Sequence, residues 1–240
     1  MKTTTIFLSL IFGSLLFSSC DLDHVLVSKR ITTREFTYSD YSGIKVSNAF
    51  NVYVTFSDTE ERIEVEANAN LHDKIRVQKE GNDLVIEMKK HTLIRGKSTL
   101  DVYIKTKNIS NFDISGASEV FLENELITQS ANIELSGASD FYGALNVSAL
   151  EIQAKGASNI DLFGNAAHLD ASLSGSSELK DYDFIVGAID LRLSGASEAF
   201  LSVTESIDIN ASGASTFNYK GNATIRDESL SGGSKVRRRD

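Results

Sequence analysis

Proline and tryptophan are both absent from the 240 residues, and there is only one cysteine. A single cysteine excludes an intramolecular disulfide. The chain also lacks a phosphate-binding loop, an HExxH zinc motif and the strand-Gly-x-Ser-x-Gly-helix context of a nucleophilic serine. Positive charge is scarce as well, because the formal net charge is -9 and the pI is about 5.0. No broad basic surface is therefore expected, and nucleic acid is not an expected partner.

The residues that are present favour strands. Hydrophobic residues make up 41% and charged residues 24% of the chain, which is enough apolar material for a core and too much for a disordered protein. Gly, Ser, Asn, Val, Ile and Phe are plentiful, a mixture typical of strands joined by turns that contain glycine. The first prediction is an all-β fold. The one basic cluster, KVRRRD at 235–240, is interpreted as a solvated tail.

Residues 1–19 have the pattern of a signal peptide. Lys2 provides the positive start, 6–17 form an apolar stretch too short to span a bilayer, and small serines follow. The next residue is Cys20, and LLFSSC resembles the lipobox of bacterial lipoprotein precursors, in which the cysteine is acylated and becomes the new N-terminus. This resemblance implies lipidation at Cys20 and export to the cell envelope, with anchoring in the outer membrane on its periplasmic or outer face. An ordinary secretory signal is the alternative.

Two regions follow before any repeat is visible. Residues 20–35 show no strong periodicity and are interpreted as a lipidated tether. Aspartates at 21 and 23 resemble the surface-export signals of Bacteroidetes lipoproteins. Residues 36–110 are predicted to form a β-rich N-terminal part, because apolar and polar residues alternate within five segments. These segments are NVYVTF (51–56), RIEVEA (62–67), KIRVQ (74–78), DLVIEMK (83–89) and LDVYIKT (100–106).

Residues 111–240 carry seven copies of a Gly-Ala-Ser triplet or a near copy, with glycines 21, 19, 19, 20, 18 and 19 residues apart. The glycines are Gly116, Gly137, Gly156, Gly175, Gly195, Gly213 and Gly232, and the serines are Ser118, Ser139, Ser158, Ser177, Ser197, Ser215 and Ser234. A fixed period of this size predicts a solenoid in which each repeat packs on its neighbours. Coils of about 19 residues suit a β-helix, and right-handed coiling is the expectation for parallel strands.

Apolar residues recur four and two places before each glycine and four places after it, and these three columns are the predicted core. The glycine suits a tight corner between two strands, and the serine hydroxyl is expected to bond either to other serines or to the backbone of the corner. The last copy places Glu228 in an apolar column and ends in charged residues. It is interpreted as a C-terminal cap that stops the stack.

The chain as a whole resembles a known family. The resemblance rests on YSGIKVSNAFNVYVTFSDTEERIEVEAN, then LDVYIKTKNISNFDISGASEV, the serial SGAS copies, and the closing YKGNATIRDESLSGGSKVRRR. This arrangement is similar to the putative auto-transporter adhesin, head GIN domain family of Bacteroidetes secreted and lipid-anchored proteins. The resemblance implies a single-stranded β-helix-like solenoid outside the cytoplasm, and it brings no catalytic residues.

Three functions remain open from the sequence. A binding module would use the repetitive β surface to contact a glycan, a protein or another copy of itself. A structural spacer of the envelope is the second alternative, and a polysaccharide-active enzyme is the third. The enzyme would need the acidic column that follows the repeated serines, formed by Glu119, Asp140, Glu178 and Glu198, which equally suits a divalent cation or a plain solvent-facing row.

Other candidates are weaker. His24, His72, His91 and His168 have no spacing typical of metal ligands. Aromatic residues near the corners or in the variable stretches would either form an exposed surface or pack in the core, namely Tyr142, Tyr182, Phe184 and Tyr219. We therefore expect no enzyme, cofactor or metal site.

Overall fold

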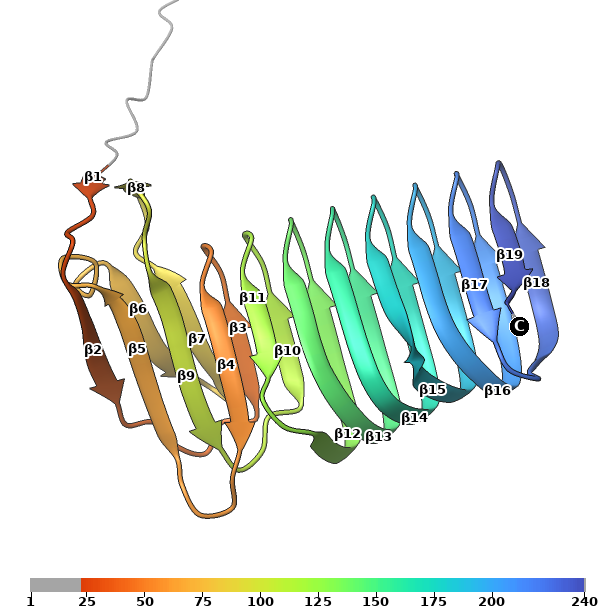
Figure 1. Ribbon diagram of the computed structural model, residues 1–240, viewed down its shortest axis with the longest axis horizontal. Coiled ribbons are helices and arrows are strands. Elements are labelled where there is room, and N and C mark those ends of the chain that lie inside the picture. Colours follow the sequence, from red (N-terminus) through yellow and green to blue (C-terminus); the bar gives the residue numbers. More distant parts are fainter. Residues whose placement is uncertain (1–22, 240) are drawn as a thin grey trace, which may run out of the picture.

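The computed structural model describes residues 23–239, which form an elongated stack of β-coils with additional strands at its N-terminal end (Figure 1). The all-β prediction is confirmed, and within residues 23–239 no helix is long and apolar enough to cross a membrane. The N-terminal strands are β1 (Asp23–Leu26), β2 (Ile31–Phe36), β3 (Gly43–Val46), β4 (Asn51–Phe56), β5 (Arg62–Asn68), β6 (Ile75–Glu80), β7 (Asp83–Met88), β8 (Thr92–Arg95) and β9 (Leu100–Thr106). The strands of the repeats are β10 (Asn111–Ile114), β11 (Glu119–Leu122), β12 (Leu126–Leu135), β13 (Asp140–Ala154), β14 (Asn159–Leu173), β15 (Glu178–Leu193), β16 (Glu198–Ala211), β17 (Thr216–Lys220), β18 (Thr224–Leu230) and β19 (Lys235–Arg238).

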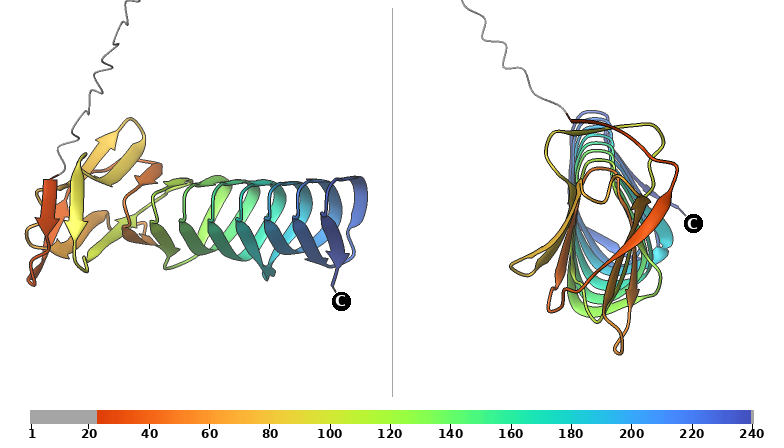
Figure 2. Two further views of the ribbon diagram at one scale, coloured as in Figure 1. Left: turned by 90° about the horizontal axis from the view of Figure 1, so that it is seen from above. Right: turned by 90° about the vertical axis from the view of Figure 1, so that its left-hand side faces the viewer.

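Each repeat is one coil of a β-solenoid. The chain makes a sharp corner at the Gly-Ala-Ser triplet and a gradual bend at the opposite edge, so that two walls of parallel strands enclose one core (Figures 1 and 2). Neighbouring coils pair in register, for example Ile133 with Ile152 and Ile152 with Ala171. The three predicted columns are buried in the first six copies. The predicted solenoid with coils of about 19 residues is therefore confirmed.

Glycine is required at the corners for two reasons. At Gly156 the φ angle is +89°, a conformation that side chains with a Cβ rarely adopt. A Cβ there would also lie 2.3 Å from the carbonyl oxygen of Gly137 in the preceding coil. That carbonyl accepts a 2.7 Å hydrogen bond from the amide of Ala157, and the same bond recurs between later corners. From Gly156 onward the corners are thus stacked too closely for a side chain at this position.

The repeated serines complete their own corners. Ser177 is buried, and its hydroxyl donates a 2.9 Å hydrogen bond to the carbonyl of Ser174, three residues earlier. The same bond forms in five of the other copies, at Ser139, Ser158, Ser197, Ser215 and Ser234. Of the two predicted partners, the backbone is the one observed. At the first corner, Ser118 instead accepts a 3.3 Å bond from the amide of Phe50.

The stack begins earlier than the first triplet. Strands β3 and β4 pair in parallel with β10 and β11, and the corner between them is Ser47-Asn48-Ala49-Phe50. Asn48 has a φ of 75°, so it takes the left-handed conformation that glycine has in the later corners. On the N-terminal side of this coil, β7 pairs in parallel with β3 and β9 pairs in parallel with β4, which adds a further layer. Residues 36–110 therefore include coil layers as well as the antiparallel strands that close the N-terminal end.

The segment predicted as a tether, 20–35, is largely part of the folded body. Strand β1 pairs with β8, and β2 pairs antiparallel with β5 over Ile31 to Phe36. The sequence did not predict the strands within residues 23–35. These strands are mostly exposed, so apolar and polar side chains do not alternate regularly along them. The predicted signal peptide and Cys20 lie outside the described residues.

The C-terminal coil differs from the others in its side chains. Glu228 pairs with Ile209 of the preceding coil but is exposed, and Leu230 is 40% exposed where its counterparts are buried. Strand β18 is exposed along most of its length and carries Arg226, Asp227 and Glu228. Charged side chains on an open edge disfavour pairing with another molecule. This placement agrees with the interpretation of the last copy as a cap.

Candidate binding surface

Four aromatic rings lie side by side on the outer face of one wall. They are Tyr103 on β9, Tyr53 on β4, Phe121 on β11 and Tyr142 on β13, and parallel pairing places them in register. The residue before each ring is a buried apolar residue, and around Tyr53 both Val52 and Val54 are buried. Alternation therefore turns all four rings outward. We call this row the aromatic ladder.

The rings of the aromatic ladder are stacked. The ring centroids of Tyr103 and Tyr53, Tyr53 and Phe121, and Phe121 and Tyr142 lie 5.1, 5.2 and 5.0 Å apart, with interplanar angles of 14°, 13° and 7°. These separations are in the range of offset stacking. The row ends at polar residues, because Glu64 pairs with Tyr103 on one side and Asp161 with Tyr142 on the other. The ladder is thus a bounded apolar strip on a polar wall.

A groove of about 430 Å³ lies beside the N-terminal end of the aromatic ladder. Its lining includes the two rings of the ladder's N-terminal end and four charged side chains, namely Tyr53, Tyr103, Arg62, Lys105, Glu64 and Glu123. We call it the ladder groove. Two cationic and two anionic side chains line it, so its formal charge is balanced. Its volume is within the range of about 300–1,000 Å³ that is usual for small-molecule sites.

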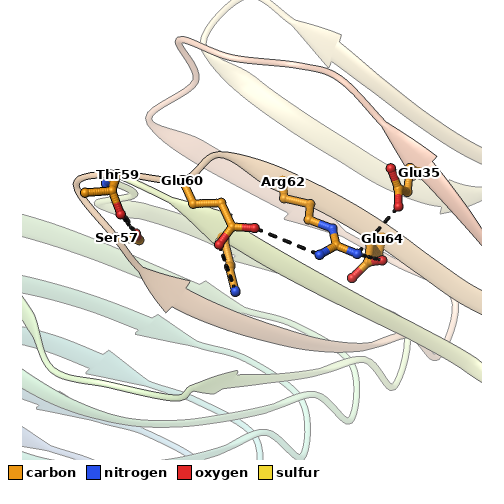
Figure 3. Close-up of polar contacts among 7 residues, drawn as sticks. Glu35, Ser57, Thr59, Glu60, Arg62 and Glu64 are labelled. Carbon is orange, nitrogen blue, oxygen red and sulfur yellow. Dashed lines mark hydrogen bonds and ion pairs between the residues drawn. The ribbon is translucent and has the colours of Figure 1, made fainter.

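Ion pairs hold three of the four charged side chains of the ladder groove, namely Arg62, Glu64 and Lys105 (Figure 3). Glu60, on the turn between β4 and β5, accepts a 2.9 Å hydrogen bond from Lys105 Nζ. Arg62 contacts Glu64 and also pairs with Glu35 at 3.5 Å and Glu60 at 3.9 Å. Each of these pairs is exposed and therefore weak by itself. Together they restrict the rotamers that the two cations adopt.

The tyrosines of the ladder remain phenols at neutral pH. Burial, followed by the negative charges of Asp101 and Glu119, raises the pKa of Tyr53. Burial and nearby carboxylates likewise raise the pKa of Tyr103 and of Tyr142. The hydroxyls are therefore available as both donors and acceptors.

The residues of the predicted acidic column lie two places before those of the aromatic ladder, on the same wall. Glu119 pairs in register with Asp140, and Glu178 with Glu198, but Asn159 stands between Asp140 and Glu178. Asn159 donates a 2.7 Å hydrogen bond to Asp140, and Lys180 lies 3.4 Å from Glu178. Among residues 23–239 no group of three or more His, Cys, Asp or Glu side chains has the geometry to hold a metal ion. Cation binding by this column remains an untested prediction.

The other candidate residues are dispersed. His72 is buried with Nε2 2.9 Å from the carbonyl oxygen of Thr32, and His168 lies 3.4 Å from Asp190 on the opposite wall. His24 and His91 are exposed at the N-terminal end. Of the four predicted aromatics, Tyr142 belongs to the ladder and Tyr182 is half-buried beside Phe200, whereas Phe184 and Tyr219 are buried.

The sequence prediction missed Tyr53, Tyr103 and Phe121. A signal for them exists, because the ring occupies the same place in VYV (52–54), VYI (102–104), VFL (120–122) and FYG (141–143). The coils at 43–54 and 83–106 do not carry the glycine triplet, so alignment on that triplet omits the first two of these segments. The register between strands is what reveals the row.

The fold and this surface define a β-solenoid protein with an outward-facing aromatic strip on one wall. The chain belongs to the family described as putative auto-transporter adhesin, head GIN domain, whose family model matches residues 40–223. A search of curated proteins found no match.

Several solved structures share the fold. A protein of Bacteroides fragilis described as a putative adhesin is 22% identical, with a TM-score of 0.83 over 89% of this chain and 99% of its own. A Parabacteroides distasonis protein described as a putative lipid binding protein is 18% identical, with a TM-score of 0.75 over 91% and 100% of the two chains. A putative adhesin of Parabacteroides merdae is also 18% identical, with a TM-score of 0.69 over 91% and 100%. At these identities the similarity establishes the fold alone.

Proposed function

We propose that this protein is a lipid-anchored adhesin of the cell envelope, which binds its partner through the outer face of the wall that carries the aromatic ladder. The observation that carries the proposal is the ladder itself. Four large rings lie side by side on a solvent-facing wall, outside the core of the stack, and apolar surface strips with a polar border are typical of interaction sites.

Membership of an adhesin family supports a binding role. The lipobox-like LLFSSC supports attachment through Cys20, because several acyl chains on one residue give stable anchoring. The described chain enters the body at β1, at one end of the stack, and the capped coil lies at the other (Figure 1). A lipid at Cys20 would therefore tether the N-terminal end and leave the long wall accessible beside the membrane.

Protease treatment of intact cells tests the location. We expect the wild-type protein to be digested without lysis, and the Cys20→Ala protein to be lost from the membrane fraction. Digestion only after lysis would overturn adhesion at the cell surface. Retention of Cys20→Ala in the membrane would overturn lipid anchoring at this residue.

Attachment assays test the role of the ladder. Cells that produce the protein are expected to attach to a target surface more than cells that lack it, and Tyr142→Ser should remove that difference. Ile185→Ser is the matched control, because Ile185 is a 49% exposed apolar side chain on β15, two strands beyond the strand β13 that carries Tyr142. Equal attachment of producing and deficient cells to every surface tried would favour the structural spacer instead.

A further inference from the structure

We propose that the ladder groove binds a neutral glycan, with a sugar unit packed against Tyr103 and Tyr53. This inference rests on the proposed binding function and names the chemical class of the ligand. Tyr103 is the end ring of the aromatic ladder and is 41% exposed, although stacking covers part of it. It therefore offers apolar surface that water solvates poorly. The C–H face of a pyranose ring is a flat apolar surface of matching size.

The polar lining fits hydroxyl groups. A sugar hydroxyl both donates and accepts hydrogen bonds, so it needs donors and acceptors close together. The ladder groove provides donors in Arg62 and Lys105 and acceptors in Glu64 and Glu123. Because Glu64 and Glu60 already pair with the two cations, these side chains are positioned before any ligand arrives. Such preorganisation lowers the entropic cost of binding.

The charges argue for a neutral ligand. The four charged residues of the lining balance each other, so a polyanion finds no excess of positive charge there. Next to the groove, the column that contains Asp101 and Glu119 is acidic and would repel uronate, sulfate or sialate groups. A basic peptide would find only Glu123 free of a cationic partner within the lining, since Glu64 is occupied by Arg62. Neutral sugars avoid both penalties.

The ladder also provides room for more than one sugar unit. Beyond Tyr53 the outward edges of Phe121 and Tyr142 continue the strip at centroid steps of 5.2 and 5.0 Å, comparable with the length of one pyranose unit in an extended chain. A sugar unit would contact these edges, because the ring faces cover one another. A glycan chain seated in the groove would then run along the ladder. Contacts repeated along a chain raise the overall affinity even when each is weak.

Binding of the purified full-length protein to an array of neutral and acidic oligosaccharides tests this inference, followed by calorimetric titration with the strongest neutral binder. The array should include neutral oligosaccharides from the producing cell's own surface polysaccharide and from foreign surfaces, so that the source is identified. We expect binding to neutral members, little dependence on salt, and an association constant about tenfold lower in Tyr103→Ala. Tyr103→Phe should bind nearly as well as the wild type, and Ile185→Ala should be unchanged.

Thermal denaturation of each variant separates loss of binding from loss of folding. If Tyr103→Ala is unfolded, Glu123→Gln provides the test at an exposed side chain and should weaken binding several-fold. Lack of binding to every neutral glycan, by a protein whose cells still attach, would overturn the glycan assignment and leave the proposed function standing. Binding restricted to acidic glycans or to basic peptides would overturn it as well, as would equal losses in Tyr103→Ala and Ile185→Ala.

Discussion

The rings of Tyr53 and Tyr103 lie 5.1 Å apart on neighbouring parallel strands, although β4 and β9 are separated in the chain by the antiparallel strands β5 and β6 and by the β8 excursion. The pair forms because the chain leaves the coil stack after β4 and returns to it at β9. The aromatic ladder is thus a product of the stacked layers, and its two N-terminal rings come from coil layers without the glycine triplet.

Stacking between Tyr53 and Tyr103 is expected to contribute measurably to stability. A double-mutant cycle with Tyr53→Ala, Tyr103→Ala and the double variant should give a coupling free energy of about 0.5–1 kcal/mol in chemical denaturation. Tyr53→Ala should cost more than Tyr103→Ala, because Tyr53 contacts rings on both sides. Additive effects of the two substitutions would show that the rings do not interact energetically.

Three glycine substitutions separate backbone strain from steric conflict at the corners. Gly156→Ala combines a φ of +89° with a Cβ 2.3 Å from a backbone oxygen, and should lower the free energy of unfolding by about 3 kcal/mol or more. Gly81→Ala has a φ of +61° but no atom within 4 Å of the added Cβ, so about 1–2 kcal/mol is expected.

Gly233→Ala is the matched control for these two. It lies in the last corner, has no positive φ, and its added Cβ would be 3.6 Å from the Gly213 oxygen. Its free energy of unfolding should be within about 0.5 kcal/mol of the wild type. Equal losses in Gly156→Ala and Gly81→Ala would indicate that the coils move apart readily, contrary to the close stacking described above.

A coil can be predicted from the sequence only where its corner has the same residues as the other corners. Gly156, Gly175, Gly195, Gly213 and Gly232 each combine a positive φ with a backbone oxygen within 2.6 Å of an added Cβ, so glycine recurs there and makes the period visible in the sequence. Asn48 takes the same backbone conformation as these glycines, and Phe50 replaces the serine. The corner of the coil at 43–54 therefore has a different residue sequence. Different residues satisfying one backbone requirement explain why this coil was missed.

The candidate surface was less predictable than the core. Burial restricts the inward columns to apolar residues, whereas outward positions accept rings, carboxylates or amides. Tyr53, Phe121 and Tyr142 form one feature only because their strands pair in register. That register depends on contacts between distant segments, and alternation within a single strand does not reveal it.

Asp161 is expected to make stability depend on pH. Its carboxylate is half-buried, its Oδ1 has no hydrogen-bond partner among the described residues, and burial raises its pKa above the ordinary value of 3.8. The folded protein then holds this proton more tightly than the unfolded chain does. The resulting stabilisation is complete below pH 3.8 and is lost as the pH rises through the raised pKa.

Asp161→Asn should therefore raise the melting temperature at pH 7 and give a smaller gain, or a loss, near pH 3.5. The two melting curves, measured across this pH interval, test the effect. Asp183→Asn, at an exposed position of β15, controls for removing one negative charge from an acidic chain. Equal gains in both variants at pH 7 would assign the effect to net charge and not to burial of Asp161.

The C-terminal coil should keep the protein from associating end to end. Glu228 occupies an apolar column, and one edge of its strand β18 pairs with no strand of residues 23–239. Glu228→Ile restores an apolar residue where Ile209 stands in the preceding coil, and so removes one of the charges that protect the edge. We expect a concentration-dependent increase in mass by light scattering.

Glu228→Gln, which keeps the polarity and removes only the charge, should remain close to the wild type. An unchanged mass in Glu228→Ile would assign the protection to the remaining charges of β18 and β19, of which Arg226 and Arg237 are the next to replace.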